Sequence, residues 1–371
     1  MNPLRSLCLA GAALAAASPV TSQDLLGVSW SGSVVRIDSH TGAVSSVGVG
    51  LSGLNCLARG SNGAFYSVRR VSSSFHMLVT IDPATGATTP IGGCADVRGL
   101  AEGPGNTLYG VRYTPFGNTL IAIDAASGGY ATIGSTGFVG IQGLAVHQNT
   151  LYAWDVLEGL LVVDPLTGAA TDPFPGVPVP TYLQSLCSHP DGRLLVGGGD
   201  SNGVDPLYVV DLATGAPTLI GQMNGAVDLR GIEPLGAFVS PFGQGCNGVF
   251  GPVSLSVTGS PQPGGFLSTT STNHAANAFG LIVFGADSLV FNGTPLPVLL
   301  DPLFGTSGCR LYTAIDGALP MIAGAAGPAS LQFGFAVPPT AGGELVHLQH
   351  VCLENVPGGM SWSNAVAVRI E

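Results

Sequence analysis

Short apolar runs separated by turn residues recur along the first 236 residues of the chain. One repeat shows the pattern fully, with runs at residues 108–111, 120–123, 131–134 and 141–145. Each run has the length and the β-branched content of a strand, and turn residues separate the runs. Each repeat is therefore predicted to form one four-stranded sheet.

One motif occurs five times, each time between the second and third runs. It has the form Ile/Val-Asp-x-x-Thr/Ser-Gly, in which x is variable. A spacing of 40 to 47 residues between copies is typical of repeat architectures with one four-stranded sheet per repeat. The Asp can accept hydrogen bonds from turn N–H groups, and the Gly supplies the positive φ that closes the turn. We interpret these aspartates as hairpin caps and not as a metal-binding or catalytic ring: Asp38, Asp82, Asp124, Asp164 and Asp211.

The phase of the repeats predicts a closed ring. The first repeat begins at residues 25–30, which match the run at residues 108–111, and the last ends at residues 229–233, which match the run at residues 141–145. If the run at residues 141–145 is innermost, the chain starts at the second strand of one sheet and ends at the first. The last strand would then complete the first sheet and remove its open edges. The expected architecture of residues 23–236 is a five-bladed β-propeller in an all-β protein.

Residues 189–195, with the sequence His-Pro-Asp-Gly-Arg-Leu-Leu, are typical of one family of such repeats. The region from about residue 24 to residue 236 resembles secreted bacterial β-propeller repeats of the broad YVTN, NHL and lactonase-like kind. The resemblance implies the architecture and no particular activity, because propellers host lyases, hydrolases, lectins and scaffolds.

One position of the innermost strand is polar in all five repeats, with apolar residues before it and mostly small residues after it. Equivalent positions of inner strands converge near the central channel of a closed ring. We therefore predict a hydrogen-bonding ring of two guanidinium groups and three amides at the channel: Asn55, Arg98, Gln142, Gln184 and Arg230.

Four further side chains are placed to join this ring at a channel mouth. Asp96 and Asp228 precede the two arginines by two residues and so lie on the same side of each strand. Tyr182 and Glu233 are the other two. Two interpretations stay open: the ring is structural, with each Arg paired to its Asp, or it binds a glycan or another small polar or anionic ligand.

The N-terminal residues have the form of a secretory signal peptide. Arg5 is the single charge before an apolar run at residues 6–17, and Val20 and Ser22 suit a cleavage site before Gln23. Cleavage after residues 15–17 is the alternative. The run is shorter than the roughly 20 apolar residues that span a membrane. We expect residues 1–22 to be removed and the mature protein to be secreted or held at the cell surface, with no membrane span.

Composition narrows the functional classes. The 371 residues include 22 acidic and 11 basic residues, and all the basic residues are arginine. The lack of lysine excludes Schiff-base and lysine-nucleophile mechanisms. No basic stripe is present to bind nucleic acid or an anionic membrane.

No catalytic motif stands out, whether a Gly-x-Ser-x-Gly elbow or a phosphate-binding loop. An exported polysaccharide hydrolase or lyase is nevertheless an alternative, with Asp96, Asp228 and Glu233 as its acids near the channel. Three of the five repeats supply no acid at these positions. The histidines of the repeats occupy unrelated positions and are expected to be solvated turn residues: His40, His76, His147 and His189.

The repeat period ends near residue 236, and residues 236–241 are expected to form a linker. Alternating apolar runs then recur and predict a β-sandwich of about seven strands in residues 237–371. The runs lie at residues 253–257, 280–284, 310–314, 331–335, 344–350 and 365–370. His347 and His350 fall on opposite faces of one such strand, which argues against a metal site.

The C-terminal region carries Phe-Gly-Gln-Gly-Cys at residues 242–246, Gly-Cys-Arg-Leu at 308–311 and Ser-Asn-Ala at 363–365. In these residues it is similar to a C-terminal module of many otherwise unrelated secreted proteins from planctomycete-type bacteria. The resemblance implies a disulfide between Cys246 and Cys309. Six cysteines follow the signal peptide, three in each half, so either the halves are cross-linked or each keeps an unpaired thiol.

We therefore expect an exported, monomeric and non-enzymatic binding or scaffold protein without a cofactor, whose C-terminal module anchors or sorts it at the cell surface. Geometry separates this hypothesis from the hydrolase. Acids that each pair with an arginine favour binding, whereas two carboxylates within catalytic reach in an open pocket favour an enzyme.

Overall fold

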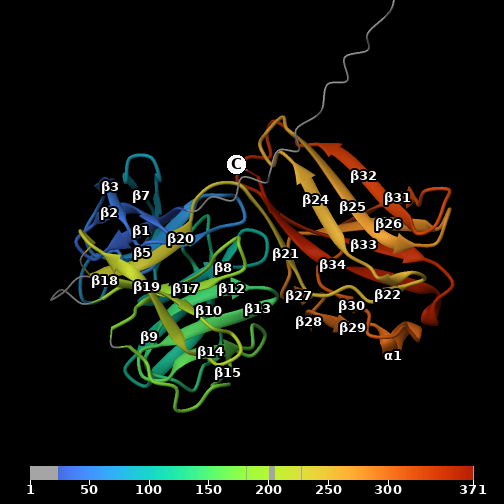
Figure 1. Ribbon diagram of the computed structural model, residues 1–371. Coiled ribbons are helices and arrows are strands. Elements are labelled where there is room, and N and C mark those ends of the chain that lie inside the picture. The colour runs from blue at the N-terminus through green and yellow to red at the C-terminus, as the bar shows by residue number, and fades with distance from the viewer. Residues whose placement is uncertain (1–23, 181, 200–204, 227, 371) are drawn as a thin grey trace, which may run out of the picture.

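The computed structural model describes residues 24–180, 182–199, 205–226 and 228–370, so the expected signal peptide lies outside the described residues. Regular structure in the described part is almost entirely antiparallel strand, which confirms the all-β prediction. The exceptions are the short helix α1 (Asp301–Phe304) and the 3-10 turn η1 (Pro357–Gly359). Among these residues no helix has the length and apolar character needed to cross a membrane. Figure 1 shows two halves, blue to yellow and orange to red.

The first half consists of five four-stranded antiparallel sheets in the described residues. The first sheet has the order β20 (Leu229–Pro234), β1 (Asp24–Ser29), β2 (Ser33–Asp38), β3 (Val44–Val49). The second and third are β4 (Ala58–Arg59), β5 (Phe65–Arg70), β6 (His76–Ile81), β7 (Thr88–Cys94), and β8 (Val97–Glu102), β9 (Thr107–Thr114), β10 (Gly117–Asp124), β11 (Tyr130–Ser135). The last two are β12 (Ile141–His147), β13 (Thr150–Asp155), β14 (Gly159–Val163), β15 (Ala170–Thr171), and β16 (Ser185–Ser188), β17 (Leu194–Gly197), β18 (Asp205–Val210), β19 (Pro217–Met223).

The first strand of each sheet lies at the centre. Strands β4, β8, β12, β16 and β20 each contact the next in this order, and β20 contacts β4, so that the contacts form a closed ring. The first sheet joins both ends of the region, because β20 pairs with β1 and places Ile232 opposite Gly27. This pairing is the one that the phase of the repeats predicts.

Small residues let the inner strands approach one another at backbone distance. A Cβ atom added to Gly231 would lie 2.5 Å from the backbone nitrogen of Leu57, and one added to Gly143 would lie 2.8 Å from that of Leu186. A pocket lined by residues from all five inner segments has a volume of only about 10 Å³. The two ends of the central channel are therefore separate sites.

The second half contains a five-stranded and a three-stranded sheet that share one apolar core. Leu267 and Leu331 of the smaller sheet pack with Ile282, Leu348 and Val366 of the larger one. The larger sheet has the order β21 (Phe238–Phe242), β34 (Met360–Arg369), β33 (Leu345–Leu353), β26 (Phe279–Gly285), β31 (Gly317–Ile322), and the smaller one β24 (Leu255–Gly259), β25 (Phe266–His274), β32 (Ala329–Ala336). Three two-strand pairs complete it: β22 (Asn247–Gly248) with β23 (Gly251–Pro252), β27 (Val290–Phe291) with β28 (Thr294–Pro295), and β29 (Val298–Leu299) with β30 (Arg310–Leu311).

Two expectations for this half are wrong. The expected linker at residues 236–241 contains most of β21, which pairs with β34 at the edge of the larger sheet. Pro241 lies within this strand, which is possible because proline is tolerated in edge strands. The apolar run at residues 310–314 contributes only the two-residue strand β30.

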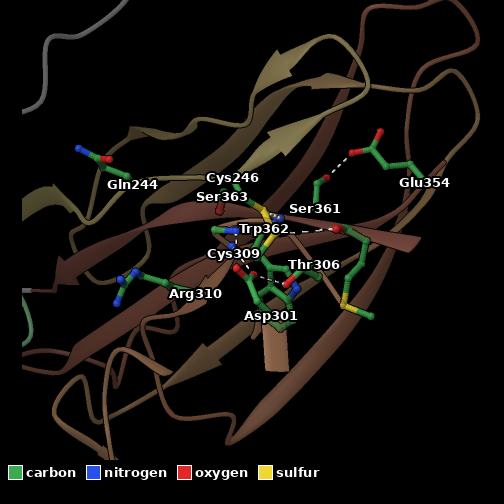
Figure 2. The surroundings of a disulfide bond; sticks show 12 residues. Gln244, Cys246, Asp301, Thr306, Cys309, Arg310, Glu354, Ser361, Trp362 and Ser363 are labelled. Atoms are coloured by element: carbon green, nitrogen blue, oxygen red, sulfur yellow. Dashed lines mark hydrogen bonds between the residues drawn. A yellow bond between two sulfur atoms is a disulfide. The ribbon is translucent and has the colours of Figure 1, made fainter. Parts of the chain in front are cut away.

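Cys246 and Cys309 form a disulfide, the pair that the resemblance implies (Figure 2). Asp301 holds the loop before Cys309, because its carboxylate accepts hydrogen bonds from the Thr306 hydroxyl at 2.8 Å and from the Gly308 N–H at 2.8 Å. The remaining described cysteines are unpaired, so each half keeps at least one thiol: Cys56, Cys94 and Cys187 in the first half and Cys352 in the second.

Candidate functional site

Four of the five predicted ring residues gather at one end of the central channel. Arg98, Gln142, Gln184 and Arg230 line an open cavity of about 190 Å³ there, together with Val156 and Tyr182. We call this cavity the channel mouth. The fifth ring residue, Asn55, does not line it.

Asn55 has a structural role instead. Its side chain is buried, and its Nδ2 donates a hydrogen bond to the carbonyl of Val97 at 2.9 Å. The bond ties the segment just before β4 to the start of β8, the inner strand of the third sheet. The structural interpretation of the ring therefore holds for Asn55, and the sequence could not distinguish it from its four equivalents.

Arg98 is fixed by its neighbours in the channel mouth. Its Nε and Nη2 donate to the two carboxylate oxygens of Asp96 at 3.1 and 3.2 Å. Its guanidinium carbon lies 4.9 Å from the ring centre of Tyr113, a cation–π arrangement. These contacts leave Nη1 of Arg98 with no hydrogen-bond partner in the part of the chain that the structure describes.

Arg230 is fixed in the same manner. Its Nε donates to Asp228 at 2.5 Å, and its Nη1 donates to Oε1 of Gln184 at 2.5 Å. Gln184 in turn donates from Nε2 to the carbonyl of Gly199 at 2.8 Å. The guanidinium carbon of Arg230 lies 5.4 Å from the ring of Trp30. Both arginines are thus held by a carboxylate and an aromatic ring.

The channel mouth has almost no net charge, because each guanidinium faces its own carboxylate. It still offers polar groups, since the Gln142 amide makes no hydrogen bond to any other described residue. Tyr182 is 56% exposed and has a φ of 67°, a backbone region that non-glycine residues adopt at an energetic cost. The mouth is thus suited to a neutral polar ligand that can contact an aromatic ring.

Glu233 was expected at this mouth and lies elsewhere. It lines a second cavity of about 120 Å³ at the opposite end of the inner strands, where the ring of sheets meets the C-terminal half. Glu102 lines the same cavity and accepts a hydrogen bond from Nη2 of Arg369 at 2.8 Å. The sequence prediction missed Glu102 because it stands at the end of β8, where the other repeats carry unrelated residues.

The two glutamates of the second cavity are electrostatically coupled. Burial raises the pKa of Glu233 to about 8; Arg369 acts in the opposite direction, and Glu102 adds to the increase. Burial also raises the pKa of Glu102, against the effect of the Arg369 guanidinium. The three acids expected for a hydrolase are therefore not brought together, because Asp96 and Asp228 lie at the other end of the channel.

The histidines of the repeats are mostly buried, and the prediction that they are solvated is wrong for three of the four. His76, His147 and His189 are buried, and only His40 is exposed. Nδ1 of His147 lies 2.8 Å from the Ser188 hydroxyl, and burial lowers the pKa of His147 to about 4. His147 and His189 line the second cavity, which the C-terminal half covers. Because the residues that bury these histidines come from a distant segment, the sequence around the histidines does not predict their burial.

No protein-family model and no curated protein matches the chain. Among solved structures it is similar to a chain of the nidogen/laminin complex, at 12% identity over 57% of this chain and 97% of that chain, with a TM-score of 0.40. It is also similar to TolB from Acinetobacter baumannii (12% identity, 67% and 60% covered, TM-score 0.36) and to a gluconolactonase from Xanthomonas campestris (19%, 47% and 68%, 0.32). These neighbours are β-propeller-type proteins, and likenesses this low support no statement about activity.

Proposed function

We propose that the chain is an exported binding protein whose channel mouth holds a neutral, hydroxyl-rich ligand, such as one sugar residue of a glycan. The observation that carries the proposal is the pairing of each mouth arginine with its own aspartate, at 3.1 Å for Arg98 and 2.5 Å for Arg230. The pairing cancels the charge and leaves guanidinium N–H groups and the Gln142 amide for ligand hydroxyls. Tyr182 supplies an exposed ring for the apolar face of a sugar.

The proposal includes the architecture around the mouth. Five four-stranded sheets whose inner strands contact one another in a closed order support a five-bladed β-propeller. Two sheets around one core support a β-sandwich for the second half, which we propose attaches the protein to the cell surface.

The same pairing disfavours the alternative hydrolase or lyase. Glycoside hydrolysis uses two carboxyl groups on either side of the scissile bond, one as acid and one as base or nucleophile. Asp96 and Asp228 are each bound to an arginine, and Glu233 lies beyond a constriction of about 10 Å³.

A glycan array on the purified mature chain, followed by titration of the best ligand, tests the proposal. Gln142→Ala and Tyr182→Ala should each weaken binding about fivefold, because one hydrogen bond or ring contact contributes about 1 kcal/mol. Phe116→Ala, on a ring that is 97% exposed elsewhere, is the matched control and should bind normally.

Salt provides a second readout. Affinity at a neutral site should change little between low and physiological ionic strength, because screening acts on charged partners. Binding that is unaffected by both mouth variants, or turnover of a polysaccharide in a parallel hydrolase panel, would contradict the proposal. A steep loss of affinity with salt would show an anionic ligand instead.

A further inference from the structure

A line of polar side chains crosses the core of the C-terminal half, between its two sheets. His350 and Cys352 on β33, and Glu354 directly after it, alternate along the chain and so face the same side. Thr269 and Ser271 on β25 are spaced in the same way. All five residues are buried. Polar groups are unfavourable in a core unless they are satisfied, so this stripe requires an explanation.

Hydrogen bonds run along the stripe in one direction. The Thr269 hydroxyl donates to the carbonyl of Phe333 at 3.1 Å, so it accepts from Nε2–H of His350 at 3.0 Å. Nδ1 of His350 is then an acceptor, and the Ser271 hydroxyl donates a hydrogen bond to it at 2.8 Å. The Ser271 oxygen accepts in turn from Nε2–H of His274 at 2.8 Å. The network thus assigns the ring proton of neutral His274 to Nε2.

This assignment leaves Nδ1 of His274 with a lone pair, and Nδ1 lies 3.3 Å from Oε1 of Glu354. Glu354 itself receives hydrogen bonds. The Ser361 hydroxyl donates to its Oε1 (Figure 2), and the Ala275 N–H donates to its Oε2 at 2.9 Å. An imidazole lone pair and a carboxylate that accepts two other donors face each other, and this contact becomes favourable when a proton or a metal cation lies between them.

Cys352 completes the surroundings of that position. Its sulfur, a ring nitrogen of His274 and a carboxylate oxygen of Glu354 all lie within 4.8 Å of one another, and all three side chains are buried. Ligands of a tetrahedral ion with bonds of about 2.0 to 2.3 Å lie roughly 3.5 Å apart, so small side-chain movements would bring the three atoms onto one ion.

We propose that His274, Cys352 and Glu354 bind one divalent metal ion of the zinc class in the core of the C-terminal half. Nitrogen, sulfur and carboxylate oxygen are the ligands that zinc takes, and a thiolate disfavours magnesium and calcium. Ser271 accepts the hydrogen bond that fixes the orientation of His274, as outer partners of metal-bound histidines do. The site is independent of the channel mouth and of its proposed ligand.

Metal analysis of the full mature chain tests this site. Protein purified from zinc-supplemented culture should hold about one zinc per chain by mass spectrometry of the metals. Protein refolded without metal should unfold at a lower temperature than protein refolded with zinc, because an ion that binds only the folded state stabilises it. Refolding with cobalt should give an absorption band from thiolate-to-cobalt charge transfer.

Variants locate the ion. Cys352→Ser should lose the charge-transfer band, and Ser271→Ala should weaken metal binding about 10- to 100-fold. Cys187→Ser is the matched control, because Cys187 is also a fully buried free thiol but lies in the other half. A wild-type chain without zinc, both as purified and after refolding with zinc or cobalt, would overturn the proposal. Equal metal binding by the Cys352→Ser and Cys187→Ser chains would also overturn it, and if Cys352→Ser does not fold, the wild-type metal content and cobalt spectrum decide.

Discussion

At the residue scale, Glu233 shows how burial controls a single ionisable group. Burial, aided by Glu102, raises its pKa to about 8 in the folded chain, whereas an unfolded glutamate titrates near pH 4.3. Between these two pH values the folded chain keeps a proton that the unfolded chain has released. The free energy of unfolding therefore falls as pH rises through this window, and the loss is complete above about pH 8.

Glu233→Gln should remove this part of the pH dependence, because glutamine has no proton to lose. We expect the variant to be more stable than the wild type at pH 9, by on the order of 2 kcal/mol after allowance for screening, and similar to it near pH 4. Urea unfolding from pH 4 to pH 9 measures the difference. Glu158→Gln, at an exposed site, is the control. An unchanged slope in Glu233→Gln would contradict the assignment.

Residue roles were predictable from the sequence where the partner is close in the chain. Asp96 and Asp228 pair with arginines two residues away, and Asp82 caps its own turn through the Ala84 N–H at 2.9 Å. Asn55 was misplaced because its partner is the carbonyl of a neighbouring sheet, 42 residues away. Glu102, His147 and His189 depend on a cover from the second half, which local patterns do not encode.

At the element scale, the inner strands depend on small residues at backbone contact. Gly231→Ala would place a Cβ 2.5 Å from the backbone nitrogen of Leu57, so neighbouring sheets would have to separate. We expect a loss of about 1 to 3 kcal/mol in the free energy of unfolding, as for other overpacked sites. Gly324→Ala is the control, because nothing lies within 4 Å of its added Cβ.

Urea unfolding of the two glycine variants at one pH measures this effect. Equal stability of Gly231→Ala and Gly324→Ala would show that the inner strands are not in the close contact described. A Gly231→Ala chain that is too unstable to purify would be consistent with the expectation, provided that Gly324→Ala folds normally.

The strands of the first half could be predicted from the sequence, because one hydrogen-bonded turn occurs in each repeat and sets its phase. A further repeat signal was overlooked: an outer-strand glycine packs against the next hairpin tip, with an added Cβ on Gly48 only 2.0 Å from the Thr85 carbonyl. Gly92, Gly134 and Gly221 have the same contact with their neighbours. In the second half β25 was missed, because its inward positions Thr269 and Ser271 are polar and interrupt the apolar pattern that Leu267 begins.

At the scale of the whole molecule, the two halves meet through polar groups of distant segments. Nη1 of Arg369 donates to the carbonyls of Gly60 and Gly343, both at 2.9 Å, and its Nη2 donates to Glu102. Asn149 donates to the carbonyl of Tyr312 at 2.6 Å. The repeat period and the strand patterns predict each half by itself, but no sequence pattern links a residue near position 60 with one near position 369.

Arg369 should therefore couple the unfolding of the halves. Arg369→Met keeps the apolar stem but removes the guanidinium, so Glu102 loses its ion-pair partner and the carbonyls of Gly60 and Gly343 lose this donor. Removal of one partner of a largely buried ion pair is expected to reduce stability by about 3 kcal/mol. In scanning calorimetry we expect two separated transitions where the wild type gives one, whereas Arg310→Met, at an exposed arginine of the same half, should resemble the wild type.

The double variant Arg369→Met, Glu102→Gln separates charge from contact. Removing both charges should recover part of the stability lost by Arg369→Met, because no carboxylate is then buried without its partner. The carbonyls would still lack their donor, so the recovery should be incomplete. If the double variant is no more stable than Arg369→Met, the ion pair contributes little, and the hydrogen bonds from Arg369 to the carbonyls hold the halves together.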